Sequence, residues 1–465
     1  ERRTIKMSKK SNSYYLKEAP IRKAIAHLSI PMMIGISATT IYNLINAYFI
    51  GLVHDTNMMS TITLGLTITI VFMAIGNLFG VGGGTFITRL LGSGDKEKGK
   101  KIAGYSFYMS LIIGLLIGLV SLFFLSPIAH ILGADAATLT YTKEYAGVLL
   151  GGGFSMILNY GLEQLVRAEG ASKESMYGMF VGVATSIVLD ALFILVLNLH
   201  VIGAGLSMVI ANLASTAYYV WFLENKSESL KGFLKHFKIS LKDQFEIYKI
   251  GIAEVFKSAF MIVTTLLLNH FSVQYGDNVL ASFGIALRIT QLPEFLTMGL
   301  FLGAIPLFAY SFASNNTQRL KEALKELTLW IGGISILFAL IVYLFRVPVM
   351  QLFTDDSAVI KVGLIVLAAQ LVSSVFNGFS GLFTGIFEAS GLGAQTGVMS
   401  TIQGILYIPI VIILHHFYGL TGLIWSMTLT EGIAFVAGLI MLIPYLLKLN
   451  NGKLMENQPE LAVAE

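Results

Sequence analysis

Long apolar runs separated by short polar breaks dominate this sequence. Each run is long enough to cross a lipid bilayer as a helix, which requires about 20 residues. Only 12% of the 465 residues are charged and 55% are hydrophobic, whereas a soluble domain carries about 25% charged residues. We therefore predict an all-α integral membrane protein and exclude a soluble enzyme, a collagen and a disordered chain. The twelve predicted spans are 24–51, 58–88, 102–125, 142–166, 174–197, 201–223, 247–274, 279–313, 326–345, 359–386, 394–415 and 419–447.

Lysine and arginine are unevenly distributed over the loops. Most of the 31 fall in the N-terminal tail, in the loops on the same side and in the middle linker, while the opposite loops hold only Lys143, Arg346 and Lys361. Basic residues concentrate in cytoplasmic loops, so we expect both termini in the cytoplasm. The net charge of +4 is too small to indicate nucleic acid as a partner. The chain has no cysteine, which excludes disulfides and cysteine-ligated metal. The first 23 residues contain no apolar signal-peptide region, so we expect the first span to remain in the mature protein.

Faint self-similarity indicates a duplicated unit. Gly76 and Gly80 recur 223 residues later as Gly299 and Gly303, and the stretch 167–170 recurs loosely as 388–391. Two copies of six spans have the same orientation in the membrane, and in transporters such repeats flank a midplane cavity. Chance similarity among glycine-rich helices is the alternative. The predicted divisions are an N-terminal tail 1–23, an N-lobe 24–223, a linker 224–246, a C-lobe 247–447 and a C-terminal tail 448–465.

Carboxyl groups inside the predicted spans are the main functional candidates, because a charge in the bilayer is costly. Asp190 lies late in the fifth span with no basic residue within a turn, and Ser186 shares its helix face. Asp190 is expected either to relay protons or to accept a structural hydrogen bond. Glu163, one turn before Arg167, is either half of an ordinary ion pair or a second coupling carboxylate.

The remaining embedded polar residues carry weaker signals. Glu254 and Lys257 have the spacing of an ion pair, and Arg288, Gln291 and Glu294 are expected to form a structural network. Glu431 has no charged neighbour in its span. Aromatic residues such as Tyr42 and Tyr160 could stack on an organic cation or simply pack.

Several sequence strings resemble the multidrug and toxic compound extrusion (MATE) family, most closely its bacterial MepA-like branch. The resemblance covers about residues 15–450 and implies a V-shaped pair of six-helix lobes. It also implies export of lipophilic organic cations across the bacterial cytoplasmic membrane in exchange for H+ or Na+. The matching strings are 28–35, 48–51, 76–82, 89–92, 162–164 with Arg167 and Ala168, 187–190, Arg288 with Gln291, Pro293 and Glu294, and 419–422 with Trp425 and Ser426.

The resemblance assigns Asp190 and Glu163 to the coupling carboxylates of the N-lobe, with Asn46 and Ser186 as secondary candidates. Asn46 and Asn377 stand where many relatives have aspartate, and fewer carboxylates weaken a site for a hard cation. We therefore expect proton coupling in preference to sodium, no cofactor or metal, and a monomer in the bilayer whose partners are organic cations. The residues expected around the substrate are Tyr42, Tyr160, Gln164, Glu254, Arg288, Gln291, Glu294 and Glu431.

Three other functions remain as alternatives. A lipid-linked oligosaccharide flippase shares the two-lobe plan, but its anionic pyrophosphate cargo would need unpaired basic side chains. Lys257 and Arg288, the basic residues inside the spans, each lie near a carboxylate in the sequence, which favours cationic cargo. An intramembrane enzyme has little support, because the chain contains no HExxH or GxSxG motif. A passive channel is distinguished by testing for coupled counter-transport.

Overall fold

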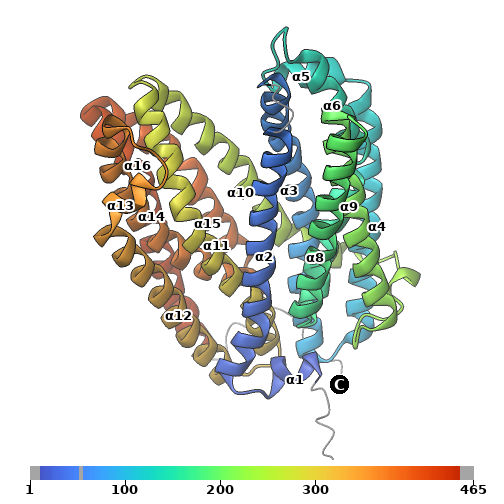
Figure 1. Cartoon of the computed structure of the whole chain (residues 1–465). Coiled ribbons are helices and arrows are strands. Elements are labelled where there is room, and N and C mark those ends of the chain that lie inside the picture. The colour runs from blue at the N-terminus through green and yellow to red at the C-terminus, as the bar shows by residue number, and fades with distance from the viewer. Residues whose placement is uncertain (1–10, 52–55, 451–465) are drawn as a thin grey trace, which may run out of the picture.

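The computed structural model describes residues 11–51 and 56–450, and every regular element in these ranges is a helix (Figure 1). Residues 1–10 of the predicted N-terminal tail and residues 451–465 of the predicted C-terminal tail lie outside the described residues. The elements are α1 (Asn12–Lys17), α2 (Ile21–Gly51), α3 (Thr56–Ser93), α4 (Lys96–Leu122), α5 (Leu125–Ile131), α6 (Leu139–Gly151), α7 (Gly153–Ala168), α8 (Ser172–Asp190), η1 (Ala191–Val196), α9 (His200–Asn225), η2 (Phe233–Lys235), α10 (Leu241–Val273), α11 (Asp277–Ala313), α12 (Thr317–Leu344), α13 (Arg346–Gln351), α14 (Ser357–Ala389), α15 (Gly393–Ile405) and α16 (Tyr407–Asn450).

Helix breaks at two glycines bring the number of membrane crossings in the described chain to the predicted twelve. Ten helical stretches of the described chain are long and apolar enough to span a membrane. The pair α6–α7, interrupted at Gly152, adds one crossing. The stretch Gly393–Asn450 contains two, because Gly419 has φ 56° and ψ −131°. A Cβ on Gly422 would lie 1.9 Å from the carbonyl oxygen of Leu414, so the chain turns back on itself here. The twelve predicted crossings are thereby accounted for.

The crossings form two helical bundles arranged as a V (Figure 1). One bundle contains α2 to α9, in which α3 packs against α4, α6 and α7. The other contains α10 to α16, in which α11 packs against α12 and α14. The segment 226–240 joins them and lies within the predicted linker 224–246. The predicted all-α, two-lobe, V-shaped fold is confirmed.

The bundles meet where glycines let their backbones touch. A Cβ on Gly251 of α10 would lie 2.0 Å from the carbonyl oxygen of Leu78 in α3. A Cβ on Gly303 of α11 would lie 2.5 Å from Cα of Ser29 in α2. Small residues permit such close approach between membrane helices. We call this contact between α2 and α3 on one side and α10 and α11 on the other the junction.

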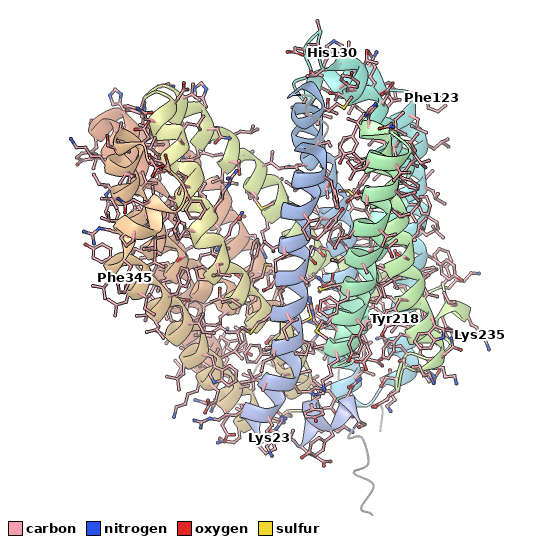
Figure 2. All side chains as sticks on the ribbon, in the orientation of Figure 1. Lys23, Phe123, His130, Tyr218, Lys235 and Phe345 are labelled. Atoms are coloured by element: carbon pink, nitrogen blue, oxygen red, sulfur yellow. The ribbon has the colours of Figure 1, made fainter. Side chains whose placement is uncertain are left out.

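The junction lies toward the end of the molecule that carries the lysine-rich segments, which we call the basic end. Figure 2 places Lys23 and Lys235 at this end, and His130 and Phe123 at the opposite end. Gly251 follows the start of α10 by a few turns, and Ser29 follows the start of α2 in the same way. The bundles therefore touch near the basic end and diverge toward the opposite end.

Ion pairs cross between the bundles at the basic end. Arg89 Nη2 of α3 lies 3.4 Å from Glu246 Oε2 of α10, and the two side chains are only 1% and 8% exposed. Lys98 Nζ at the start of α4 lies 2.9 Å from Asp243 Oδ1. Arg22 pairs with Glu326 at 3.1 Å, but its side chain is 76% exposed. Because Arg89 and Glu246 are buried, removal of either side chain leaves a costly buried charge. Solvent screens the exposed pair of Arg22 and Glu326, which therefore contributes little to stability.

Gly251→Ala tests the junction. The added methyl group must displace the Leu78 carbonyl, so we expect the free energy of unfolding to fall by about 1–3 kcal/mol. The measurement is unfolding of the purified protein in detergent by SDS titration. The matched control is Gly333→Ala, because a Cβ on Gly333 meets no atom within 4 Å. Equal stability of the two variants would contradict the proposed backbone contact.

Arg89→Met tests the buried ion pair. Removing the guanidinium leaves the buried Glu246 carboxylate with Lys249 as its remaining partner, whose Nζ lies 3.0 Å away, so we expect a loss of about 1–3 kcal/mol. The control is Arg22→Met at the exposed pair, for which we expect a loss of about 0–1 kcal/mol. The same SDS titration measures both. If Arg89→Met costs no more than Arg22→Met, the buried pair does not hold the bundles together.

Candidate functional site

Asp190 lies inside the first bundle, on the part of α8 farther from the basic end. Its side chain is fully buried and accepts a hydrogen bond of 3.0 Å from Tyr42 Oη of α2. Ser186, one turn earlier on the same helix, is also buried. A turn of π-helix, η1, follows directly after Asp190, and such turns often occur at functional sites because they reorient side chains. Tyr42, Ser186 and Asp190, all predicted from the sequence, therefore belong to one cluster.

Further buried hydroxyl groups lie in the same bundle. Ser207 Oγ of α9 donates to the Ser186 carbonyl at 3.2 Å. Thr61 of α3 and Thr142 of α6 face each other at 3.4 Å. The sequence analysis missed these residues, because isolated serines and threonines in a membrane helix usually bond their own backbone. Asn46 belongs to α2, but its side chain lies outside the described part of the structure.

Glu163 lies on α7, nearer the junction. Its Oε1 is 3.5 Å from Arg167 Nη1, so the predicted ion pair between these residues is confirmed. The side chains of Glu163 and Arg167 are 13% and 4% exposed. Arg167 also donates to Gln164 Oε1, and Gln164 Nε2 donates to Asn77 of α3 at 3.4 Å. The coupling role of Glu163 remains a prediction. Tyr160, one turn earlier, packs its Cβ against Gly76 of α3.

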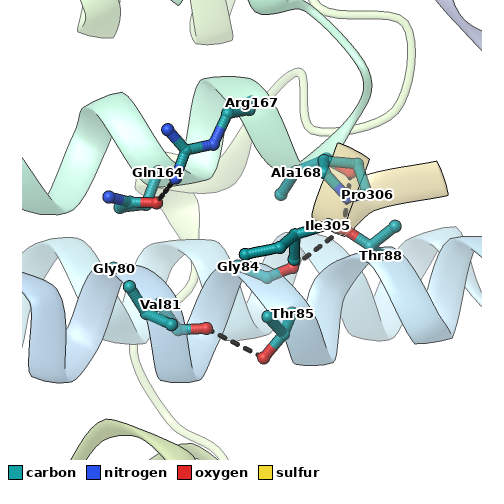
Figure 3. A pocket seen from close by; sticks show the side chains of 10 residues that line it. All are labelled: Gly80, Val81, Gly84, Thr85, Thr88, Gln164, Arg167, Ala168, Ile305 and Pro306. Atoms are coloured by element: carbon teal, nitrogen blue, oxygen red, sulfur yellow. Dashed lines mark hydrogen bonds between the residues drawn. The ribbon is translucent and has the colours of Figure 1, made fainter. Parts of the chain in front are cut away.

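A cavity of about 20 Å³ lies between α3, α7 and α11 (Figure 3). Gln164 and Arg167 line one wall, while Ile305 and Pro306 of α11 line another. Figure 3 also shows the bond of 2.6 Å from Thr88 Oγ1 to the Ala168 carbonyl, which ties α3 to α7. A cavity of this size holds about one water molecule. A drug-sized molecule therefore cannot pass here in this conformation.

Charges from both bundles meet beside this cavity. Glu254 of α10 pairs with Lys257 at 3.3 Å, as predicted, and is hydrogen-bonded to Glu388 of α14. Arg167 lies close enough to Glu388 to interact electrostatically with it. Glu388 was recognised in the sequence only as the repeat counterpart of Arg167, because the predicted span 359–386 ends before it, whereas α14 continues to Ala389. Arg89 and Glu246 were also missed, because their contact joins separate helices.

The second bundle contains its own carboxylate cluster. Glu431 of α16 accepts hydrogen bonds from Asn377 Nδ2 of α14 at 3.2 Å and Gln403 Nε2 of α15 at 3.3 Å. Glu294 of α11 lies within electrostatic range of Glu431. Both carboxylates are half-buried. The sequence-based description of Glu431 as isolated is therefore corrected, because its partners come from other helices.

The predicted network of Arg288, Gln291 and Glu294 is wrong. Arg288 and Gln291 are exposed, and among the described ion pairs none joins Arg288 to Glu294. Residues six apart are separated by about 120° around an α-helix, so Arg288 and Glu294 face different directions. The carboxylate of Glu294 instead lies within electrostatic range of that of Glu431.

Comparison with known proteins gives one consistent result. The MatE family model matches residues 31–192 and 251–413. The two matches begin 220 residues apart, as expected for a duplicated unit. The chain is 39% identical to "Multidrug export protein MepA" of Staphylococcus aureus (strain MRSA252), covering 94% of this chain and 96% of that protein. It is also 39% identical to MepA of Staphylococcus haemolyticus (strain JCSC1435), covering 92% and 95%.

A solved structure supports the fold. A structure described as the outward-facing conformation of a multidrug resistance MATE family transporter has a TM-score of 0.87 with this chain at 24% identity. The structural alignment covers 95% of this chain and 99% of the chain in that structure. The two family matches and the identity over nearly the whole length lead to one conclusion: the chain belongs to the MatE family.

Proposed function

We propose that this protein is a multidrug efflux antiporter that exports lipophilic organic cations in exchange for protons. The observation that carries the proposal is Asp190, a carboxyl group buried inside the first bundle and bonded by the Tyr42 phenol. A carboxyl group at such a place is costly and is by default functional. Family membership and the relatives named as multidrug export proteins support the same function.

The distribution of basic residues supports an orientation with the basic end in the cytoplasm. Lysine-rich segments face the cytoplasm in most membrane proteins, so the basic end is the cytoplasmic end and both termini are cytoplasmic. The protein then resides in the bacterial cytoplasmic membrane. In this orientation the junction closes the cytoplasmic side while the bundles diverge outward. Transport requires the junction to separate and the opposite ends to close, a rocking of one repeat against the other.

Coupling follows because the proton and the cationic drug compete for the negative charge of Asp190. A deprotonated Asp190 makes the first bundle more favourable for a cation, and a proton taken up from outside removes that attraction. Protonation and drug binding therefore oppose each other, which is reciprocal linkage between two ligands. Glu163 is the second candidate in this bundle, although Arg167 already neutralises much of its charge. Protons are favoured over sodium, because a site for a hard cation is strengthened by carboxylates and the sequence has asparagine at position 46 where many relatives have aspartate.

The second bundle supports a cationic substrate. Glu294 and Glu431 place two half-buried carboxylates there, and Lys257, a basic residue of α10, is paired with Glu254. A pyrophosphate-linked cargo would be repelled by Glu294 and Glu431. The lipid-linked oligosaccharide flippase is therefore the weaker candidate.

Proton release from everted vesicles tests the proposal. Inside-out membrane vesicles without sodium are acidified by respiration, and ethidium or tetraphenylphosphonium is then added. We expect the cation to dissipate the pH gradient with the unmodified protein and with Asp277→Asn, an exposed control at the start of α11. We expect no dissipation with Asp190→Asn, because the amide keeps the shape but cannot exchange the proton.

Each other outcome has a definite meaning. Full dissipation with Asp190→Asn would show that the assignment of this carboxyl is wrong. A response that appears only after sodium is added would replace protons by sodium. No response with either ion would favour the flippase or a channel. Glu163→Gln in the same vesicles separates the two interpretations of Glu163, since an unchanged rate would leave only its structural ion pair.

A further inference from the structure

The segment joining the two bundles is fixed along the first bundle. Leu230 and Phe233 are fully buried, and Tyr108 Oη of α4 donates to the Leu234 carbonyl at 2.7 Å. Gly104 of α4 leaves room for the backbone of this segment, because a Cβ there would lie 2.0 Å from the His236 carbonyl oxygen. The segment is therefore held sideways against α4.

Aromatic side chains place this segment at the surface of the bilayer. Phe237, 44% exposed, stacks on Tyr105 at 6.1 Å and meets Tyr108 edge-on at 5.7 Å. On the neighbouring α9, Tyr218 lies 5.9 Å from Trp221, which is 49% exposed. Figure 2 shows Tyr218 and Lys235 on the same lower flank of the first bundle. Tyrosine and tryptophan are enriched at the level of the lipid headgroups, so the segment lies at that level.

The exposed side chains of this region combine positive charge with apolar surface. Of its acidic residues, Asp243 is buried and pairs with Lys98, whereas Glu228 is exposed and accepts a hydrogen bond of 3.2 Å from the Asn12 backbone amide, so lysines outnumber acidic side chains at this surface. Glu224 is half-buried. From the exposed residues of this region we define the linker patch as the lysines and large apolar residues Lys226, Lys231, Lys235, Phe237, Lys238, Leu241 and Phe245.

We propose that the linker patch binds the headgroups of anionic phospholipids in the leaflet at the basic end. The lysine ammonium groups complement the phosphate charge, as basic clusters beside a membrane helix do. The exposed side chains of Leu241 and Phe245, 81% and 65% exposed at the start of α10, supply apolar surface for the acyl chains below the headgroups. The anionic lipid thus contacts the segment that connects the two bundles. This proposal does not depend on the transported substrate or on the coupling ion.

Fluorescence quenching by brominated lipids tests this proposal. The chain has three tryptophans, and the replacements Trp330→Phe and Trp425→Phe leave Trp221 as the reporter beside the linker patch. The protein is reconstituted with phosphatidylcholine and increasing fractions of phosphatidylglycerol, with bromine near the headgroup of one lipid at a time. We expect phosphatidylglycerol to associate at least about fivefold more strongly than phosphatidylcholine at this site.

Charge removal at the patch gives the decisive comparison. Replacing Lys226, Lys231, Lys235 and Lys238 by glutamine is expected to equalise the two lipids, whereas replacing the same four by arginine should keep the preference. The matched control replaces four other exposed lysines at the basic end by glutamine: Lys23, Lys173, Lys325 and Lys448. SDS titration checks that each variant is folded.

Three results would overturn the proposal. The unmodified reporter could show equal quenching by both lipids. The glutamine variant of the patch could retain the preference while folded. The control variant could lose as much preference as the patch variant, which would mean that total charge and not the linker patch attracts the lipid.

Discussion

Direct backbone contact between the two bundles at the junction is the constraint on which the rest of the structure depends. Gly251 and Gly303 let α10 and α11 approach α3 and α2 without intervening side chains, which is how membrane helices gain packing without a hydrophobic driving force. The buried pair of Arg89 and Glu246 adds charge to the same contact. Because the bundles touch at one end, they can diverge at the other, and the carboxylates of each bundle are separated by this geometry.

Buried charges in this protein are of two kinds, and their surroundings suggest two roles. At the junction, Glu163, Glu246 and Glu254 each lie next to a basic side chain, so their charge is compensated inside a medium of low dielectric constant. Asp190 receives its described hydrogen bond from a neutral phenol. A compensated pair serves to hold helices together, whereas the Tyr42 hydroxyl can donate to a carboxylate or accept from a carboxylic acid, so this hydrogen bond is compatible with both protonation states of Asp190. This contrast is the physical reason for choosing Asp190 as the exchange site.

Much of the fold was predictable from the sequence, because spans and helical ion pairs are local properties. Bilayer thickness sets the length of each apolar run, and residues four apart, such as Glu163 and Arg167, meet on one helix face. The clusters of Glu431 and of Arg89 required the tertiary arrangement, because their partners lie on other helices. The predicted network of Arg288 was wrong because residues six apart lie about 120° apart around an α-helix. Asp190 and Ser186 were predicted from a carboxyl group inside a span and its neighbour one turn away, whereas the contact of Asp190 with Tyr42 was not, since no local spacing connects these two residues.

In the proposed mechanism, a proton on Asp190 controls exchange between arrangements of the two bundles. The chain contains no cysteine, so spin labels at Phe123→Cys and Phe345→Cys report the distance between the bundles without background. Both positions are exposed, at the ends of α4 and α12. Double electron–electron resonance in lipid nanodiscs should give a distance distribution that changes with pH, and Asp190→Asn should remove this dependence. A distribution that does not respond to pH, or one that responds equally in Asp190→Asn, would contradict the claim.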